Sequence, residues 1–117
     1  MFIIAADGSS LKRFNIGSGD TNINPNLGMQ AAYLNEMPAL FFNYYNQPTY
    51  VACASPATLY YLQTLNPGTS VYIIYGLLQI SPTIVMLSLL STAASGFVTL
   101  VFVDFTSVNS PIYLQEM

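Results

Sequence analysis

The stretch that decides the fold is residues 84–103, IVMLSLLSTAASGFVTLVFV. It carries no charge and is 20 residues long, which is the length of a helix that crosses a lipid bilayer. Its centre, residues 91–96 (STAASG), is its least apolar part, and small residues of this kind favour a turn. Two strands, at residues 83–90 and 97–105, therefore fit the stretch better than one helix does. A membrane helix stays open as the alternative, with the small central residues at a helix–helix contact.

The surroundings of this stretch also favour strands. No Lys or Arg lies within 70 residues before it or anywhere after it, so no positive charge sets an orientation across a membrane. Residues 97–105, FVTLVFVDF, are nearly all β-branched or aromatic, as in a strand that is buried on both faces. We expect two largely buried faces on this strand, one with Val98, Leu100 and Phe102 and the other with Val101, Val103 and Phe105.

Regular turn signals divide the rest of the chain from residue 39 onward. Pro, Asn and Gly recur between short apolar runs, which predicts strands at 39–45, 49–54, 58–65, 70–78, 83–90, 97–105 and 112–114. Short strands at this spacing are typical of a β-sandwich or a barrel. Residues 29–35 fit either a helical turn or a strand. We predict an all-β fold with a single antiparallel β-sandwich over residues 29–117.

The first 28 residues have a different texture. Residues 7–28 are rich in Gly, Asn, Ser and Asp and show no sustained period, so we assign residues 1–28 to an irregular N-terminal arm. The arm contains one expected short strand near residues 12–16 and would gain order on assembly with neighbouring subunits. The apolar run before Asp7 is too short for a secretory signal, so we expect synthesis and folding in a cytoplasm. The single Cys53 fits this setting as a small buried hydrophobe.

Composition excludes several classes of function. Only 6% of the residues are charged, there is no His, and one Cys forms neither a disulfide within the chain nor a zinc knuckle. Without His, the Ser-His and Cys-His nucleophile pairs are absent, so we expect no enzyme, no catalytic residues, no cofactor and no small-molecule substrate. Two basic residues, Lys12 and Arg13, are too few to neutralise a nucleic-acid backbone.

One segment has the opening of a calcium-binding loop. Residues 20–24, DTNIN, place oxygen ligands at alternate positions, as such a loop does. Pro25 stands where the loop needs Gly, and Ala31 stands where it needs the bidentate Glu. We therefore interpret the segment as a polar turn and predict no metal site.

The uncharged surface points to contacts with other subunits. From residue 37 to residue 103 there is no Asp, Glu, Lys or Arg, so little charge repulsion keeps two copies of the chain apart. Tyr supplies amphipathic contact area at low entropic cost, and the candidate interface residues are Tyr44, Tyr45, Tyr72 and Tyr75. We expect Asp104 to face solvent at a strand end, with an ion pair to Lys12 or Arg13 across an interface as the alternative.

Three segments carry a resemblance to a known family: residues 40–48 (LFFNYYNQP), 66–75 (NPGTSVYIIY) and 98–105 (VTLVFVDF). Over residues 39–105 this order of strands and turns resembles the small jelly-roll penton and minor capsid proteins of tailless icosahedral phages, especially those with an internal membrane. The resemblance implies a jelly-roll-like virion subunit at a vertex. Its expected partners are copies of itself in a pentamer and neighbouring capsid subunits, with a membrane nearby.

Two other function classes stay open. The first is a small virion-associated integral membrane protein that spans the bilayer with residues 84–103. The second is a fibre or glycan-binding module that uses exposed Tyr, for which nearby carboxylates would be the mark.

Overall fold

The computed structural model describes residues 2–6, 11–15, 28–44, 47–53, 60–65, 72–91 and 98–116. In these residues ten strands form three antiparallel sheets, and no helix occurs. The strands are β1 (Phe2–Ala6), β2 (Leu11–Asn15), β3 (Gln30–Leu34), β4 (Met37–Tyr44), β5 (Gln47–Cys53), β6 (Tyr60–Thr64), β7 (Tyr72–Gln79), β8 (Ile84–Ser91), β9 (Val98–Asp104) and β10 (Ile112–Glu116).

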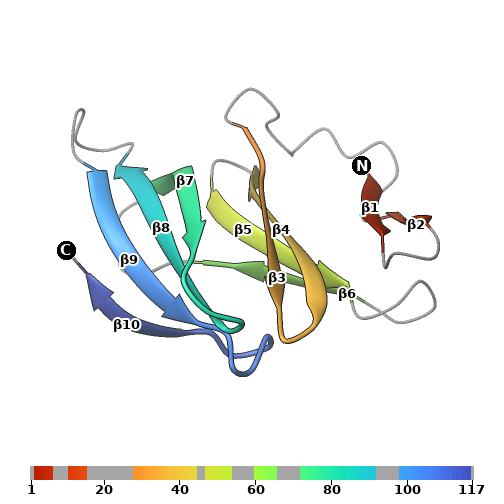
Figure 1. The fold of residues 1–117 in the computed structure, drawn as a ribbon. Coiled ribbons are helices and arrows are strands. Elements are labelled where there is room, and N and C mark those ends of the chain that lie inside the picture. Colours follow the sequence, from red (N-terminus) through yellow and green to blue (C-terminus); the bar gives the residue numbers. More distant parts are fainter. Residues whose placement is uncertain are drawn as a thin grey trace.

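Two of these sheets lie against each other as the layers of a sandwich (Figure 1). The first contains β3, β4, β5 and β6, and the second contains β7, β8, β9 and β10. The predicted antiparallel β-sandwich is therefore confirmed. Strands β4 to β10 coincide with the seven runs that the turn signals separate, with small shifts at their ends.

The order of the strands corrects the jelly-roll part of the prediction. A jelly roll is built from Greek keys, in which consecutive strands pass from one sheet to the other. Here neighbouring strands in each of the two sheets are also consecutive in the sequence. The chain passes between these sheets once, from β6 to β7. The short connections contribute to this order, since the two to four residues that join β3 to β4, β4 to β5 and β7 to β8 leave these strands as hydrogen-bonded neighbours.

The stretch at residues 84–103 contains strands, so a continuous helix over it is wrong. Strands β8 and β9 pair in an antiparallel register that runs from Ile84 opposite Asp104 to Leu90 opposite Val98. Within the part of the chain that the structure describes, no helix is long and apolar enough to cross a membrane.

A tight turn joins β3 to β4, the region where the sequence left helix and strand open. Its two residues, Asn35 and Glu36, have φ angles of 50° and 63°, and two consecutive left-handed residues form the hairpin turn that matches the twist of paired strands. The Asn35 side-chain amide donates to the carbonyls of Phe105 at 2.7 Å and Thr106 at 2.9 Å. This turn therefore fastens the first sheet to the end of β9.

The core lies between the two sheets and is centred on three aromatic rings. The Tyr50 ring stacks on Phe41 with a centroid distance of 5.6 Å and meets Phe105 edge to face at 4.8 Å. Residues at alternate positions of β8 and β9 complete the core: Val85, Leu87, Leu89, Val101 and Val103. The predicted buried face of Val101, Val103 and Phe105 is confirmed.

Polar side chains join the two sheets at the β7 side. Asn43 is fully buried on β4, and its Oδ1 accepts a hydrogen bond from the Ile74 backbone N–H at 2.9 Å. The Gln79 amide accepts from the Tyr33 N–H at 2.9 Å and donates to the Tyr33 carbonyl, as a paired strand would. These bonds hold β7 beside β3 and β4.

The N-terminal region contains more regular structure than predicted. The strand expected near residues 12–16 is confirmed as β2, and β1 pairs with it in an unexpected hairpin with Phe2 opposite Asn15. Four predictions lie outside the described residues: the calcium-like segment at 20–24, Tyr45, the turn at 92–96 and the side chain of Cys53.

Candidate functional site

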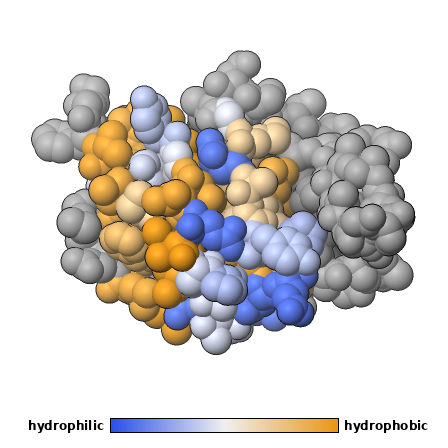
Figure 2. Space-filling model, viewed as in Figure 1, coloured by the Kyte–Doolittle hydropathy of each residue, from blue (hydrophilic) through white to orange (hydrophobic). Residues whose placement is uncertain are grey.

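The most distinctive surface of the described residues is the side of the second sheet that faces away from the core. We call it the outer β7–β10 face. Cross-strand neighbours share one face of a sheet, so the register identifies its members. Its apolar side chains are Ile73, Leu78, Ile84, Met86, Leu90, Val98, Leu100, Phe102 and Ile112. Figure 2 shows apolar residues gathered over the side of the molecule that β8 and β9 form.

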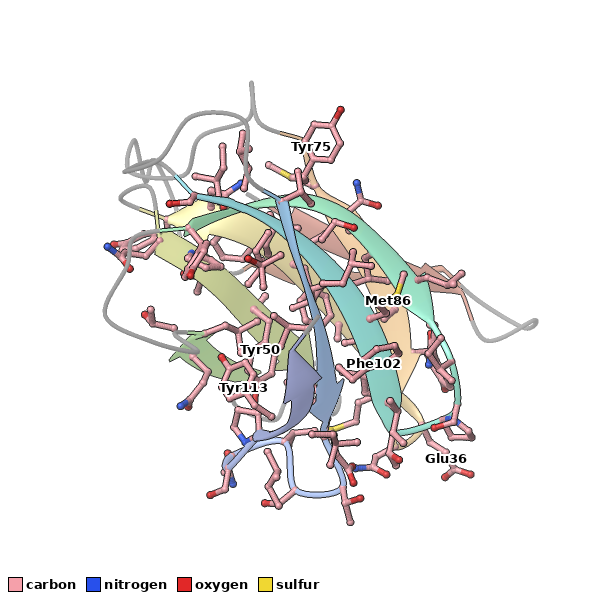
Figure 3. The ribbon with its side chains drawn as sticks, turned by 90° about the vertical axis from the view of Figure 1, so that its left-hand side faces the viewer. Glu36, Tyr50, Tyr75, Met86, Phe102 and Tyr113 are labelled. Carbon is pink, nitrogen blue, oxygen red and sulfur yellow. The ribbon has the colours of Figure 1, made fainter. Side chains whose placement is uncertain are left out.

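These side chains form rows that run across the strands. One row contains Leu78, Met86 and Phe102, and Figure 3 shows the last two beside each other on β8 and β9. The next row contains Gly76, Ser88 and Leu100, and the one after it contains Ile73, Leu90 and Val98. The face therefore has two apolar ridges, and the row between them is low at Gly76 and Ser88 and rises at Leu100.

The exposure of this face corrects the prediction for β9. Val98 is 48% exposed, whereas Leu100 and Phe102 are half-buried, so the burial predicted for this second face of β9 is incomplete. Four other half-buried apolar residues pack against the core: Ala32, Tyr72, Leu77 and Tyr113. None of them lies on the outer β7–β10 face. The lack of polar alternation in β9 predicts burial on both faces, and it does not show whether the chain itself or another surface covers the outer one.

The outer face of the first sheet behaves differently. Phe42 and Val51 point away from the core cluster, yet they are 1% and 0% exposed. Thr49, opposite Phe42 in the register, is also buried. Strands β4 and β5 thus have buried side chains on both faces, whereas β8 and β9 have fully buried side chains on the core face only.

Bulges at the two edges of the second sheet expose further large side chains. The register of β7 shifts between Ile74 and Gly76, and Tyr75 in this bulge is 71% exposed and projects from the strand (Figure 3). The register of β10 shifts between Tyr113 and Gln115, and Leu114 in that bulge is 52% exposed. Bulges of this kind re-aim side chains at sheet edges.

The four tyrosines that the sequence analysis gives as candidate interface residues have different environments. Tyr75 is a surface residue beside the outer β7–β10 face. Tyr72 packs against the core, and Tyr44 is half-buried at the end of β4. Tyr45 lies outside the described residues. Sequence reasoning missed Leu78, Met86, Leu100 and Phe102 as surface candidates, because large apolar side chains on a strand predict a core position.

Asp104 is the one charged residue on this face whose side chain the structure describes. Its carboxylate accepts hydrogen bonds from the Thr106 hydroxyl at 2.7 Å and from the Thr106 N–H at 2.8 Å. These bonds, together with one from Thr83, lower the pKa of Asp104 below its ordinary value. Asp104 therefore closes a local turn at the end of β9, in agreement with its predicted place at a strand end.

The described residues of this face are suited to binding another surface. In the described ranges no three His, Cys, Asp or Glu residues lie close enough together to hold a metal ion. The outer β7–β10 face offers apolar area, two ridges and an exposed phenol, which are means of binding another surface. No protein-family model, no curated protein and no solved structure matches this chain.

Proposed function

We propose that this chain is a structural subunit of a virion, made in the host cytoplasm and built into the capsid at a vertex penton or another minor position. The observation that carries the proposal is the outer β7–β10 face, an almost uncharged apolar surface on a small sandwich. Contiguous apolar patches of this extent mark interaction sites on soluble proteins.

The composition supports permanent packing against other subunits. Seven charged residues in 117 leave a net charge of −3, which gives weak electrostatic repulsion between copies. Interface cores are depleted in charged residues and enriched in Tyr, Phe and Met, the residue types that this sequence uses from residue 37 to residue 103.

The virion setting rests on the resemblance of residues 39–105 to small capsid proteins, and the strand order does not add to it. A vertex subunit would form a closed ring through head-to-tail contacts between the sides of neighbouring sandwiches. The sandwich supplies edge strands for such contacts, and the Lys residues that often blunt exposed edges are absent from β3 to β10.

The test is the copy number and symmetry of this chain in particles purified from the culture that produces it. We expect a fixed number of copies at symmetry-related positions, and a ring of five at each vertex for a penton. Absence of the chain from the particles, or a variable amount without symmetry, would overturn the proposal.

A matched pair of variants tests the surface itself. Tyr75→Lys should reduce incorporation into particles, because an unpaired charge or a lost anchor at an interface costs about 2–4 kcal/mol. Tyr33→Lys is the control, since Tyr33 is also exposed (58%) but belongs to β3 in the other sheet. Equal incorporation of both variants and the unmodified chain would count against Tyr75 as a contact.

A further inference from the structure

We propose that the outer β7–β10 face binds the same face of a second copy of this chain, in a two-fold dimer. The inference rests on the proposed function, in which the chain assembles with copies of itself. It goes further in naming the surface, the partner and the geometry of one contact.

Burial differs between the two sheets and singles out this surface. Phe42 and Phe102 both occupy outward positions on central strands, but Phe42 is 1% exposed and Phe102 remains half-buried. The free edge of β3 is partly closed, because the Gln79 side chain already bonds both backbone groups of Tyr33. The outer β7–β10 face is therefore an apolar face on central strands that the described residues leave only partly covered.

The ridges and the low positions of this face fit those of a second copy. The Leu78–Met86–Phe102 ridge and the row of Gly76, Ser88 and Leu100 are neighbouring rows, separated by about 6.7 Å along the strands, and the second row is low at its first two positions. A side chain added at Gly76 would meet the Ser88 Oγ at 3.8 Å, so the row has room at this point. A second copy displaced by one row seats its Leu78 and Met86 over Gly76 and Ser88, and two-fold symmetry makes the reverse contact identical.

The size of the face suits a weak dimer. Eight-residue strands such as β8 are about 27 Å long, and four strands are about 19 Å wide. The footprint is then about 500 Å² on each copy, or about 1,000 Å² in total, at the lower end of specific protein interfaces. We expect a dissociation constant in the micromolar range, which many repeated contacts in a shell would reinforce.

The charge pattern favours a copy over an anionic surface. Neither Lys nor Arg occurs between residue 14 and residue 117, so no cation on this face attracts anionic lipid headgroups or nucleic acid. Asp104 lies at the end of β9, on the perimeter of the face, where its carboxylate is already bonded to Thr106. Pairing of two such faces juxtaposes apolar rows at the centre and leaves each carboxylate at the rim.

Sedimentation equilibrium of the purified full chain tests the proposal with three variants. Leu78→Lys and Met86→Lys place a cation in the ridge, and Tyr33→Lys adds the same charge at an exposed position of the other sheet. Leu78 is 55% exposed, so Leu78→Lys should keep the fold, as a β-type circular dichroism spectrum would show. Each variant reduces the magnitude of the net charge, from −3 to −2, so weaker association cannot come from greater overall repulsion.

The expected result is a wild-type dimer that Leu78→Lys and Met86→Lys weaken about a hundredfold and Tyr33→Lys leaves unchanged. The effect is large because two-fold symmetry places each substitution in the interface twice. If the wild type and the two ridge variants associate equally, this inference is overturned and the proposed function still stands. A wild type that is monomeric at every concentration also overturns it, whereas the particle experiment alone decides the proposed function.

Cross-linking adds a test of geometry. In a Cys53→Ala background, Ser88→Cys should form a dimer with a short bismaleimide, because Ser88 lies at a low position in the central row of the face. Ala31→Cys, exposed on β3 of the other sheet, should stay monomeric. Cross-linking at Ala31 in preference to Ser88 would place the contact elsewhere and overturn the inference.

Discussion

Replacement of Tyr50 by Phe should stabilise the protein. Tyr50 is fully buried between the rings of Phe41 and Phe105, and its hydroxyl has no hydrogen-bond partner among the described residues. Folding therefore strips water from this hydroxyl without a bond in return. Phe keeps both ring contacts and removes the desolvated group.

The size of the effect follows from two opposing contributions. A buried hydroxyl without a partner costs about 1–3 kcal/mol, while the small void left by one oxygen costs a few tenths of a kcal/mol. The net gain is about 1 kcal/mol for Tyr50→Phe, which corresponds to a rise in Tm of about 4 °C for a chain of this size. Tyr50→Ala should instead destabilise by about 4 kcal/mol, because it removes the ring from the core.

The gain should grow in alkaline solution. Burial raises the pKa of the Tyr50 hydroxyl to about 12, and the nearby Tyr113 adds to the shift (Figure 3). In the unfolded chain the hydroxyl loses its proton near pH 10, so the folded state binds more protons between pH 10 and pH 12. Wild-type stability therefore falls across this window, by up to about 3 kcal/mol from this group, and the Phe variant lacks this loss.

Urea denaturation of both proteins at pH 8 and at pH 11 measures these differences. Tyr113→Phe is the control, because it keeps the Tyr50 hydroxyl and should retain most of the alkaline sensitivity, burial being the larger cause of the shift. A Tyr50→Phe variant that is less stable than the wild type by 1 kcal/mol or more would show that the hydroxyl has a bonding partner, and the reasoning would fail.

Two further substitutions test the polar contacts of the fold. Asn43→Ala should destabilise by about 1–3 kcal/mol in urea denaturation, because it leaves the buried N–H of Ile74 without an acceptor; a change within a few tenths of a kcal/mol would mean that another group replaces it. Asp104→Asn should reduce the loss of stability on acidification. Hydrogen bonds from Thr106 lower the pKa of Asp104, so its contribution is present above the unfolded value near 3.8 and disappears as the pH falls through the lowered folded value. Thermal melts from pH 2 to pH 6 should then show a shallower acid decline for the variant, and identical slopes would contradict the assignment.

Local patterns determined where the strands lie. Apolar runs bounded by Pro, Gly and Asn predicted strands β4 to β10, because turn chemistry and strand propensity act over a few residues. The side-chain period of two also placed Val101, Val103 and Phe105 on one face. The Asn35–Glu36 turn was missed, although Asn is a residue that tolerates a left-handed backbone, since its partner Glu gives no such signal.

The tertiary structure decided which apolar faces are covered and how the strands are ordered. Phe42 and Phe102 are the same residue type in similar strands, and their different burial depends on what packs above each sheet. The Asn43–Ile74 bond joins residues 31 apart, and the meander order emerges from which strands pair. Such contacts are made between distant parts of the chain, so a local pattern of apolar residues specifies that a face is to be buried without specifying whether the chain itself or a partner buries it.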